Sequence, residues 1–443
     1  MSLKFGTDGV RGVAFEELTT DLVYALGRAA VRVLGGDEPF HVGRDTRESG
    51  PALQAALAAG LAAEGAGVVD LGVIPTPGVA SVCATRHAPG AVLSASHNPY
   101  QDNGVKFFAQ GGVKLTDDVE QRIEDQMREL VSAADGQRHE TTQVRDEGAV
   151  AEYERQLLDS LEGRRLHGLS VVLDCANGAS SAIAPRVFEA AGARVTVIAN
   201  APTGTNINDG CGSTHPEALQ AEVARVGADA GLAFDGDADR VLAVDAAGDL
   251  VDGDHILAIC ALDRRERSRL VDDTLVVTVM ANLGLRIAME QHDVHVVETA
   301  VGDRYILEAM ASGGWTLGGE QSGHIVFRDL ATTGDGMLTG LQLLDVVARS
   351  GRSLAELAAV MTRLPQVMIN VRGVDCARLD DTPSIWAMVD KETIGLGSNG
   401  RVLLRKSGTE PIVRVMVEAA TEPQAHEVAE RIAALVQEEL ALS

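Results

Sequence analysis

The sequence predicts an α/β protein with several domains. Helix and strand signals alternate along most of the chain, which is the pattern of sheets covered by helices. The chain has 443 residues, whereas a single hydrophobic core rarely grows beyond about 250–300 residues. Aromatic residues make up only 3%, so Ala, Val, Leu and Ile must build the core, a mix that suits helix-on-sheet packing.

The first predicted domain spans residues 1–148. Thr19 or Thr20 can cap a helix that ends at residues 35–36, because its apolar side chains recur on one face. The apolar pattern then fades in the polar stretch 135–148, which ends this domain. Between them the sequence predicts strands at 40–42, 68–71 and 91–94 and a helix at 51–64.

Three more domains are expected, at 149–252, 253–364 and 365–443. For the second, the pattern predicts helices at 150–162, 181–191 and 216–226 and strands at 170–174, 194–199 and 230–234. The third has strands at 275–279 and 294–297 and helices at 303–311 and 336–349. After Pro365 the pattern changes to a smaller α+β domain, with strands at 366–371, 402–404 and 413–417 and a helix at 422–440.

Composition excludes some function classes. The net charge is −26, from 38 basic and 64 acidic residues, which argues against nonspecific binding to nucleic acid or to an anionic membrane. The five cysteines are odd in number and none has CxxC spacing, so we expect reduced thiols in a cytoplasmic protein. No apolar leader is evident, and the most apolar helix is expected in a core and not in a membrane.

A serine lies in the polar run SASHNP at 94–99. Ser96 is not a nucleophile elbow, because that motif needs glycine two residues before and after the serine. Taken alone, the run is better explained as a Ser/Asn/Pro turn leaving a strand. The following DNGVK at 102–106 adds a tight turn and a cation, so Lys106 and His97 could balance a phosphate or move a proton beside Ser96.

Three carboxylates fall within five residues in the run DGDADR at 235–240. Carboxylates this close repel each other unless a cation lies among them. The run is not an EF-hand, because that loop needs Gly at position 6 and Glu at position 12. We expect Mg²⁺ on Asp235, Asp237 and Asp239, with Arg240 neutralising a phosphate beside it. A phosphatase in which Asp235 itself attacks phosphate, and a solvated acidic turn, remain alternatives.

Three further loops carry groups that can bind anions or sugars. The run RKSGTEP at 405–411, with Arg414 beyond it, is a hairpin turn that could also cradle a phosphate. The run GGEQSGH at 318–324 could bind sugar hydroxyls, although a plain glycine-rich turn explains it equally well. In FGTDGVRG at 5–12 we favour a functional Arg11, whereas Arg44 and Arg47 are expected to form structural ion pairs.

Taken in order, these segments resemble the α-D-phosphohexomutase family over the whole length of the chain. The long motifs that carry the likeness, in order, are 5–12, 94–99 with 102–106, 206–216, 235–240, 319–324 and 405–411. Gln321 and the run 206–216 are similar to the branch of the family that acts on glucosamine phosphates.

The resemblance implies an activity and a set of site residues. It implies four domains around a central cleft, three related α/β domains and a smaller C-terminal α+β domain. It implies a phosphoserine at Ser96, and one Mg²⁺ per chain held by a phosphoserine oxygen and the three aspartates. Glucosamine 6-phosphate would become glucosamine 1-phosphate through a 1,6-bisphosphate, on the route to cell-wall amino sugars.

The resemblance also implies which residues bind the transferring phosphoryl group and which bind the rest of the substrate. Ser96, His97, Lys106, Arg11 and Arg240 would surround the transferring phosphoryl group, where charge builds up. Nine side chains or backbone groups would bind the rest of the substrate: Glu320, Gln321, Ser322, His324, Arg405, Ser407, Gly408, Thr409 and Arg414.

The expected partners are small. Glucosamine 1,6-bisphosphate or glucose 1,6-bisphosphate would act as activator or intermediate, and a kinase or self-phosphorylation would charge Ser96. A homodimer is considered, and no nucleic acid or membrane is expected. The alternatives left open are a glucose or mannose phosphomutase of the same family, a metal-dependent sugar phosphatase and a phosphosugar-binding sensor.

Overall fold

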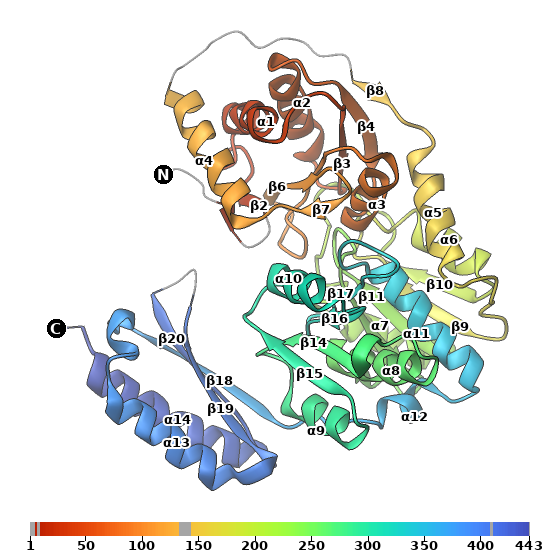
Figure 1. Cartoon of the computed structure of the whole chain (residues 1–443). Helices are drawn as coiled ribbons and strands as arrows, with labels where there is room; N and C mark the ends of the chain where they lie inside the picture. The colour runs from red at the N-terminus through yellow and green to blue at the C-terminus, as the bar shows by residue number, and fades with distance from the viewer. Residues whose placement is uncertain (1–4, 7–8, 133–142, 408–410, 443) are drawn as a thin grey trace. The chain divides into compact units, whose positions relative to one another are not determined.

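The computed structural model describes residues 5–6, 9–132, 143–407 and 411–442, whose strands form four sheets (Figure 1). The chain divides into two compact units. One comprises residues 1–280 and 293–360, and the other comprises residues 281–292 and 361–443. The four-domain α/β class expected from the sequence is confirmed by the sheets. No helix among the described residues is both long and apolar enough to cross a membrane.

The first sheet has eight strands in the order β1-β2-β6-β5-β3-β4-β8, with β7 on β6. Strands β3, β4 and β5 run parallel, and helices connect them. Its elements are β1 (Phe5–Gly6), β2 (Gly9–Val13), α1 (Thr20–Leu34), β3 (Phe40–Arg44), α2 (Gly50–Ala63), β4 (Val68–Val73), α3 (Thr76–Arg86), β5 (Gly90–Leu93), β6 (Asp102–Ala109), β7 (Val113–Lys114), α4 (Asp117–Ser132) and β8 (Val144–Arg145).

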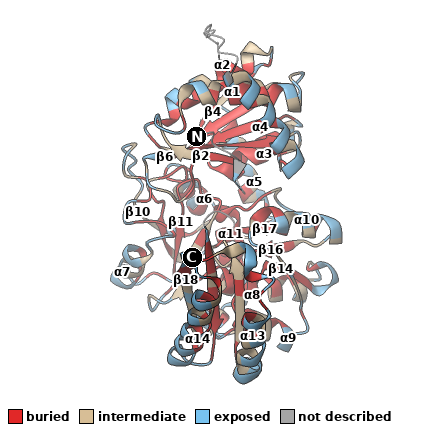
Figure 2. Ribbon diagram, turned by 90° about the vertical axis from the view of Figure 1, so that its left-hand side faces the viewer, coloured by how far each residue is buried: buried red, intermediate tan, exposed pale blue. Residues whose placement is uncertain are grey.

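The second sheet has five strands in the order β10-β9-β11-β12-β13. Its central strand β11 is wholly buried, in keeping with the buried strands of Figure 2. The elements are α5 (Ala149–Asp159), β9 (Ser170–Asp174), α6 (Ala184–Ala190), β10 (Arg194–Ile198), α7 (Glu217–Val226), β11 (Ala230–Phe234), β12 (Val241–Asp245) and β13 (Leu250–Val251). Helix α6 begins three residues later than expected, since Pro185 lies in its first turn.

The third sheet has four strands in the order β15-β14-β16-β17. Its elements in the first unit are α8 (Gly253–Glu266), β14 (Thr274–Thr278), β15 (His295–Thr299), α10 (Asp303–Gly313), β16 (Leu317–Gly319), β17 (Ile325–Phe327), α11 (Gly336–Ser350) and α12 (Leu354–Ala358). Helix α11 starts where Asp335 accepts a hydrogen bond from the Leu338 backbone N–H, which satisfies one of the free amides at the helix start.

The second unit contains an antiparallel three-stranded sheet in the order β18-β20-β19. An apolar core forms between this sheet and helices α13 and α14. The unit's elements are α9 (Leu283–Gln291), β18 (Gln366–Arg372), α13 (Pro383–Leu396), β19 (Arg401–Lys406), β20 (Ile412–Glu418) and α14 (Glu422–Leu440). Helices α3, α4, α8, α9, α12 and α13 lie where the sequence predicts no helix.

Candidate active site

The Ser96 loop follows the C-terminal end of β5, as the sequence predicts. Ser96 is 1% exposed and has a positive φ of 52°, an uncommon conformation for a side chain other than glycine, and one typical of functional sites. Its hydroxyl donates to Oδ2 of Asp235 at 2.5 Å and lies 3.4 Å from Nδ1 of His97. The candidate nucleophile therefore lies directly beside the aspartate run.

Two side chains hold this loop by its backbone carbonyls. The side chain of Arg47 is fully buried and pairs with Asp45 at 2.9 Å, so the ion pair expected there is confirmed. Its guanidinium also donates to the carbonyl oxygens of Ser96, at 3.0 Å, and Asn98, at 2.9 Å. From the second sheet's domain, the Asn208 amide donates to the same two oxygens, at 2.9 and 3.0 Å. Contacts from the first domain and from the second domain therefore fix the conformation of the Ser96 loop.

Arg44, the other expected ion pair, is placed 3.7 Å from Asp70. This arrangement confirms the structural interpretation for Arg44. The sequence interpretation of Arg47 was incomplete, because the same guanidinium also binds the Ser96 loop.

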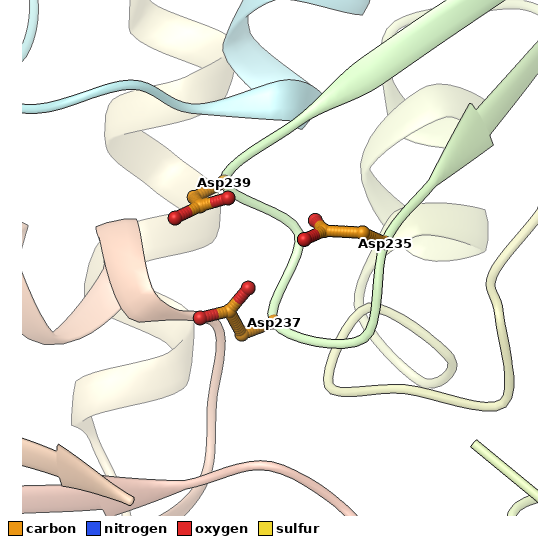
Figure 3. A group of neighbouring side chains, drawn as sticks. All are labelled: Asp235, Asp237 and Asp239. Carbon is orange, nitrogen blue, oxygen red and sulfur yellow. The ribbon is translucent and has the colours of Figure 1, made fainter. Parts of the chain in front are cut away.

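The three aspartates lie on one loop after β11 and face a common space (Figure 3). Asp235 and Asp237 are 0% exposed and Asp239 is 3% exposed. Each offers an oxygen, and these oxygens lie within 4.8 Å of one another. Among the described residues, Oδ1 of Asp237 and Oδ1 of Asp239 have no hydrogen-bond partner. Buried oxygens that lack a partner fit a hard divalent cation such as Mg²⁺.

Electrostatics also indicates a cation at this loop. Burial, together with the charges of Asp239 and Asp237, raises the pKa of Asp235 well above its usual value. The pKa of Asp239 is lowered, because Lys106, His324 and Arg240 outweigh the effect of burial. Ionising all three buried carboxylates at once is unfavourable, because their negative charges repel each other. A divalent ion bound among them would offset this repulsion.

A lysine of the first domain contacts the aspartate loop. Lys106 is 3% exposed, and its ammonium lies 2.8 Å from Oδ2 of Asp237 and 3.5 Å from Oδ2 of Asp239. Arg11 lies on β2, opposite Gly104. Burial, then the charges of Arg240 and Arg11, lower the pKa of His97 to about 4. The structure thus places His97 beside Ser96, Lys106 beside Asp237 and Arg240 beside Asp239. Arg11 is connected to this site by its effect on the pKa of His97, and the catalytic roles of all four stay predictions.

The tight turn expected within 102–106 is wrong. These residues begin strand β6 and pair with β2 in antiparallel register, Asp102 with Val13 and Gly104 with Arg11. A Cβ at position 104 would lie 2.7 Å from the Ser94 carbonyl oxygen, so this glycine allows a close approach of two backbones. Pairing between distant segments overrides the local preference of Asn-Gly for a turn.

The candidate sugar loop connects β16 and β17 and lies against the start of β12. Gly323 accepts from the Val241 backbone N–H at 3.1 Å. With φ of 88°, a Cβ at position 323 would lie 2.1 Å from the Val241 carbonyl oxygen, so only glycine fits there. Ser322 donates to Glu320 at 3.4 Å, and the Gln321 amide donates to Asp252 at 3.3 Å. The loop thus presents linked polar groups next to the aspartate run.

His324 is the last residue of this loop. It is 2% exposed and is placed 3.2 Å from Asp303 and 3.7 Å from Asp239. Asp303 and Asp239 together outweigh burial and raise the pKa of His324. The substrate-binding role of His324 stays a prediction, because its ring nitrogens lie next to the carboxylates of Asp303 and Asp239.

The candidate distal phosphate loop belongs to the second compact unit. Arg405 on β19 lies directly opposite Arg414 on β20. Burial, with the nearby charge of Arg414, lowers the pKa of Arg405. Ser407 follows β19 and its N–H donates to the Ile412 carbonyl at 3.0 Å, as in the expected hairpin. Gly408 and Thr409 lie outside the described residues.

The family of the chain follows from its sequence. Four domain descriptions match consecutive stretches: phosphoglucomutase/phosphomannomutase alpha/beta/alpha domain I over 2–133, domain II over 151–248, domain III over 252–364 and the C-terminal domain over 368–435. The chain therefore belongs to the phosphoglucomutase/phosphomannomutase family.

Within that family the chain is similar to phosphoglucosamine mutases. It is 55% identical to the phosphoglucosamine mutase of Kineococcus radiotolerans over 456 aligned positions, which cover 100% of both chains. It is 53% identical to that of Thermobifida fusca, again over 100% of both chains.

Solved structures agree on the fold. A phosphoglucomutase/phosphomannomutase family protein of Burkholderia thailandensis matches with a TM-score of 0.80 and 25% identity, over 98% of each chain. The N-acetylphosphoglucosamine mutase of Aspergillus fumigatus, in complex with GlcNAc-6P and magnesium, matches with a TM-score of 0.71 and 19% identity, over 99% of this chain and 96% of that one.

Proposed function

We propose that this chain interconverts glucosamine 6-phosphate and glucosamine 1-phosphate through a phosphoserine at Ser96. The observation that carries the proposal is the 2.5 Å contact between the Ser96 hydroxyl and Asp235, at the edge of a buried three-carboxylate cluster. This contact places a group that can carry phosphate beside a site that fits a divalent cation. Full-length relatives named phosphoglucosamine mutase support the choice of sugar.

Mg²⁺ on Asp235, Asp237 and Asp239, completed by a phosphoserine oxygen, is the proposed cofactor site. When bound, Mg²⁺ would neutralise charge on the transferring phosphoryl group. The fungal relative solved with GlcNAc-6P and magnesium supports this assignment. The chain's own part is to hold Ser96 and the carboxylates in fixed positions, with Lys106 and Arg240 beside them.

The reaction needs two phosphoryl transfers of opposite direction. In the first, the P–O bond to Ser96 breaks and a P–O bond to the free sugar hydroxyl forms, which gives a 1,6-bisphosphate. After the sugar reorients, Ser96 takes back the other phosphate, so the serine ends as it began and no phosphate is consumed. A relative solved in complex with glucose 1,6-bisphosphate supports a bisphosphate ligand. Arg405, Ser407 and Arg414 are the proposed contacts for the phosphate that does not react.

The cellular role of the chain and the source of the phosphate on Ser96 stay predictions. We expect a cytoplasmic enzyme that supplies amino sugar for UDP-N-acetylglucosamine and cell-wall synthesis, with a kinase or self-phosphorylation charging Ser96. A homodimer is likewise a prediction.

Turnover of glucosamine, glucose and mannose phosphates by one preparation, together with intact mass and phosphosite mapping, tests the proposal. We expect one phosphoryl group on Ser96 and the highest kcat/KM on glucosamine phosphate. Steady release of inorganic phosphate would favour a phosphatase instead, and a higher kcat/KM on glucose or mannose phosphate would favour another mutase of the family.

A further inference from the structure

A buried threonine of the first domain contacts the aspartate run of the second. Thr76 is the first residue of α3 and is 0% exposed. It stands between Pro75 and Pro77, and the first backbone N–H groups of a helix have no partner inside the helix. Thr76 donates its N–H to the Asp237 carbonyl oxygen at 3.0 Å. The start of α3 is thereby joined to the backbone of the aspartate loop.

The Thr76 side chain makes a second contact with the same residue. Its hydroxyl donates to Oδ2 of Asp237 at 2.6 Å, and the Lys106 ammonium approaches that same oxygen at 2.8 Å. Two donors use the acceptor capacity of Oδ2. The other oxygen, Oδ1, is buried and has no hydrogen-bond partner among the described residues. The Asp237 carboxylate is therefore held by one oxygen and leaves the other available.

We propose that Thr76 is a positioning residue that orients Asp237 so that Oδ1 faces the metal ion. This inference rests on the proposed Mg²⁺ site and extends it to a residue outside the motifs of the sequence. The backbone contact sets the position of Asp237, and the hydroxyl contact sets the rotation of its carboxylate. Because Thr76 lies in the first domain and Asp237 in the second, the same contacts also join the two domains beside the aspartates.

Direct metal binding by the dephosphorylated full-length protein tests the proposal. Titration with Mn²⁺ and with Mg²⁺, followed by calorimetry, gives Kd values that do not depend on turnover. Thr76→Val keeps the shape of the side chain and removes the hydroxyl, and we expect Kd to rise about 10- to 100-fold, the usual cost of losing a group that orients a ligand. Thr76→Ser keeps the hydroxyl and should stay within about twofold of the unsubstituted protein.

A matched control is available in Thr339. It is also 0% exposed, but its hydroxyl has no hydrogen-bond partner among the described residues. Thr339→Val therefore removes a buried hydroxyl without touching Asp237, and Kd should not change. In activity assays, Thr76→Val should need more Mg²⁺ for half-maximal rate and regain most of kcat at high Mg²⁺. A purely structural role would lower Tm and leave the metal Kd unchanged.

A second pair of variants covers the case in which Thr76→Val does not fold. Thr76→Ser keeps a strong O–H donor, whereas Thr76→Cys has only a weak S–H donor. We expect the Cys variant to bind Mn²⁺ several-fold more weakly than the Ser variant. Equal Kd values for this pair, or an unchanged Kd in folded Thr76→Val, would overturn the proposal. If the unsubstituted protein bound Mn²⁺ but did not turn over glucosamine phosphate, the proposed function would fail, and the Kd values of the Thr76 variants would still decide the role of Thr76.

Discussion

Beside Ser96, the buried Asp237 and Asp239 lie next to cations, whereas at the hairpin β19–β20 two guanidiniums face each other. Lys106 lies against Asp237 and Asp239, and Arg240 lies beside Asp239. In the second unit, Arg405 and Arg414 are direct cross-strand neighbours and half-buried. Like charges directly opposite each other in a sheet repel, and burial, helped by the charge of Arg414, lowers the pKa of Arg405.

The difference between these two regions suggests different tasks. Interlocking buried contacts keep reacting groups in a fixed geometry, so damage there should reduce kcat. Two facing cations favour an anion in both the ground and the transition state, so damage there should mainly raise KM. The following variants test this division, beginning with the largest expected effect.

Ser96→Ala should reduce mutase turnover by at least about a thousandfold, since no other hydroxyl of the loop contacts Asp235. Steady-state kinetics with glucosamine 6-phosphate measures the loss, and phosphosite mapping should find no phosphate on the variant. Ser94→Ala is the comparison variant. The Ser94 hydroxyl binds Asp45 and the Ser96 N–H, so we expect partial loss with Ser96 still phosphorylated. Near-normal turnover by Ser96→Ala would give the role of nucleophile to Asp235.

Asn208→Ala should lower kcat about 10- to 100-fold with little change in KM. The amide donates to the carbonyls of Ser96 and Asn98, and two hydrogen bonds contribute roughly 1–3 kcal/mol together. Asn208 also has a positive φ of 58°, so Ala adds backbone strain as well. Asn208→Gly removes the amide without that strain and separates the two causes. Full kcat in the Gly variant would show that the amide does not position the loop.

Sequence patterns predict much of this site because its chemistry is local. Three aspartates in five residues and a serine after a strand are visible in the chain, and the structure places Ser96 beside Asp235. Thr76 could not be predicted, because its importance depends on a contact with Asp237, 161 positions away. The same reason explains the missed strand at 102–109, which is defined by its partner β2. Helix α3 begins with Thr-Pro-Gly, a local turn signal that tertiary packing overrides.

Arg405→Ala should raise KM about tenfold or more and change kcat less, because a charge-assisted contact to phosphate is worth roughly 1.5–3 kcal/mol. Its Tm should not fall, since the substitution removes repulsion with Arg414. Lys406→Ala is the matched control: it removes the next cation on β19, whose side chain points to the opposite face of the sheet and binds Asp380 at 2.6 Å. A loss of kcat alone in Arg405→Ala would contradict the division of tasks.

Substitutions in the sugar loop should have the smallest effect, a change of about two- to tenfold in the ratio of kcat/KM for glucosamine and glucose phosphates. The two sugars differ at C2 by an amine against a hydroxyl, and Gln321 offers both a donor and an acceptor. Its amide is held by Asp252 at 3.3 Å, so Gln321→Glu would both change the group near C2 and repel that carboxylate.

The same loop supplies its own controls. Ser322→Ala removes only the donor to Glu320 and should leave the ratio unchanged, whereas Glu320→Ala should lower kcat/KM for both sugars alike. Because the substrate must bind in two orientations, the contacts have to suit both, and the loop can discriminate only moderately. We therefore expect measurable turnover of glucose phosphate by the unsubstituted enzyme. A ratio that stays constant in every variant at positions 320–322 would place sugar recognition on other residues.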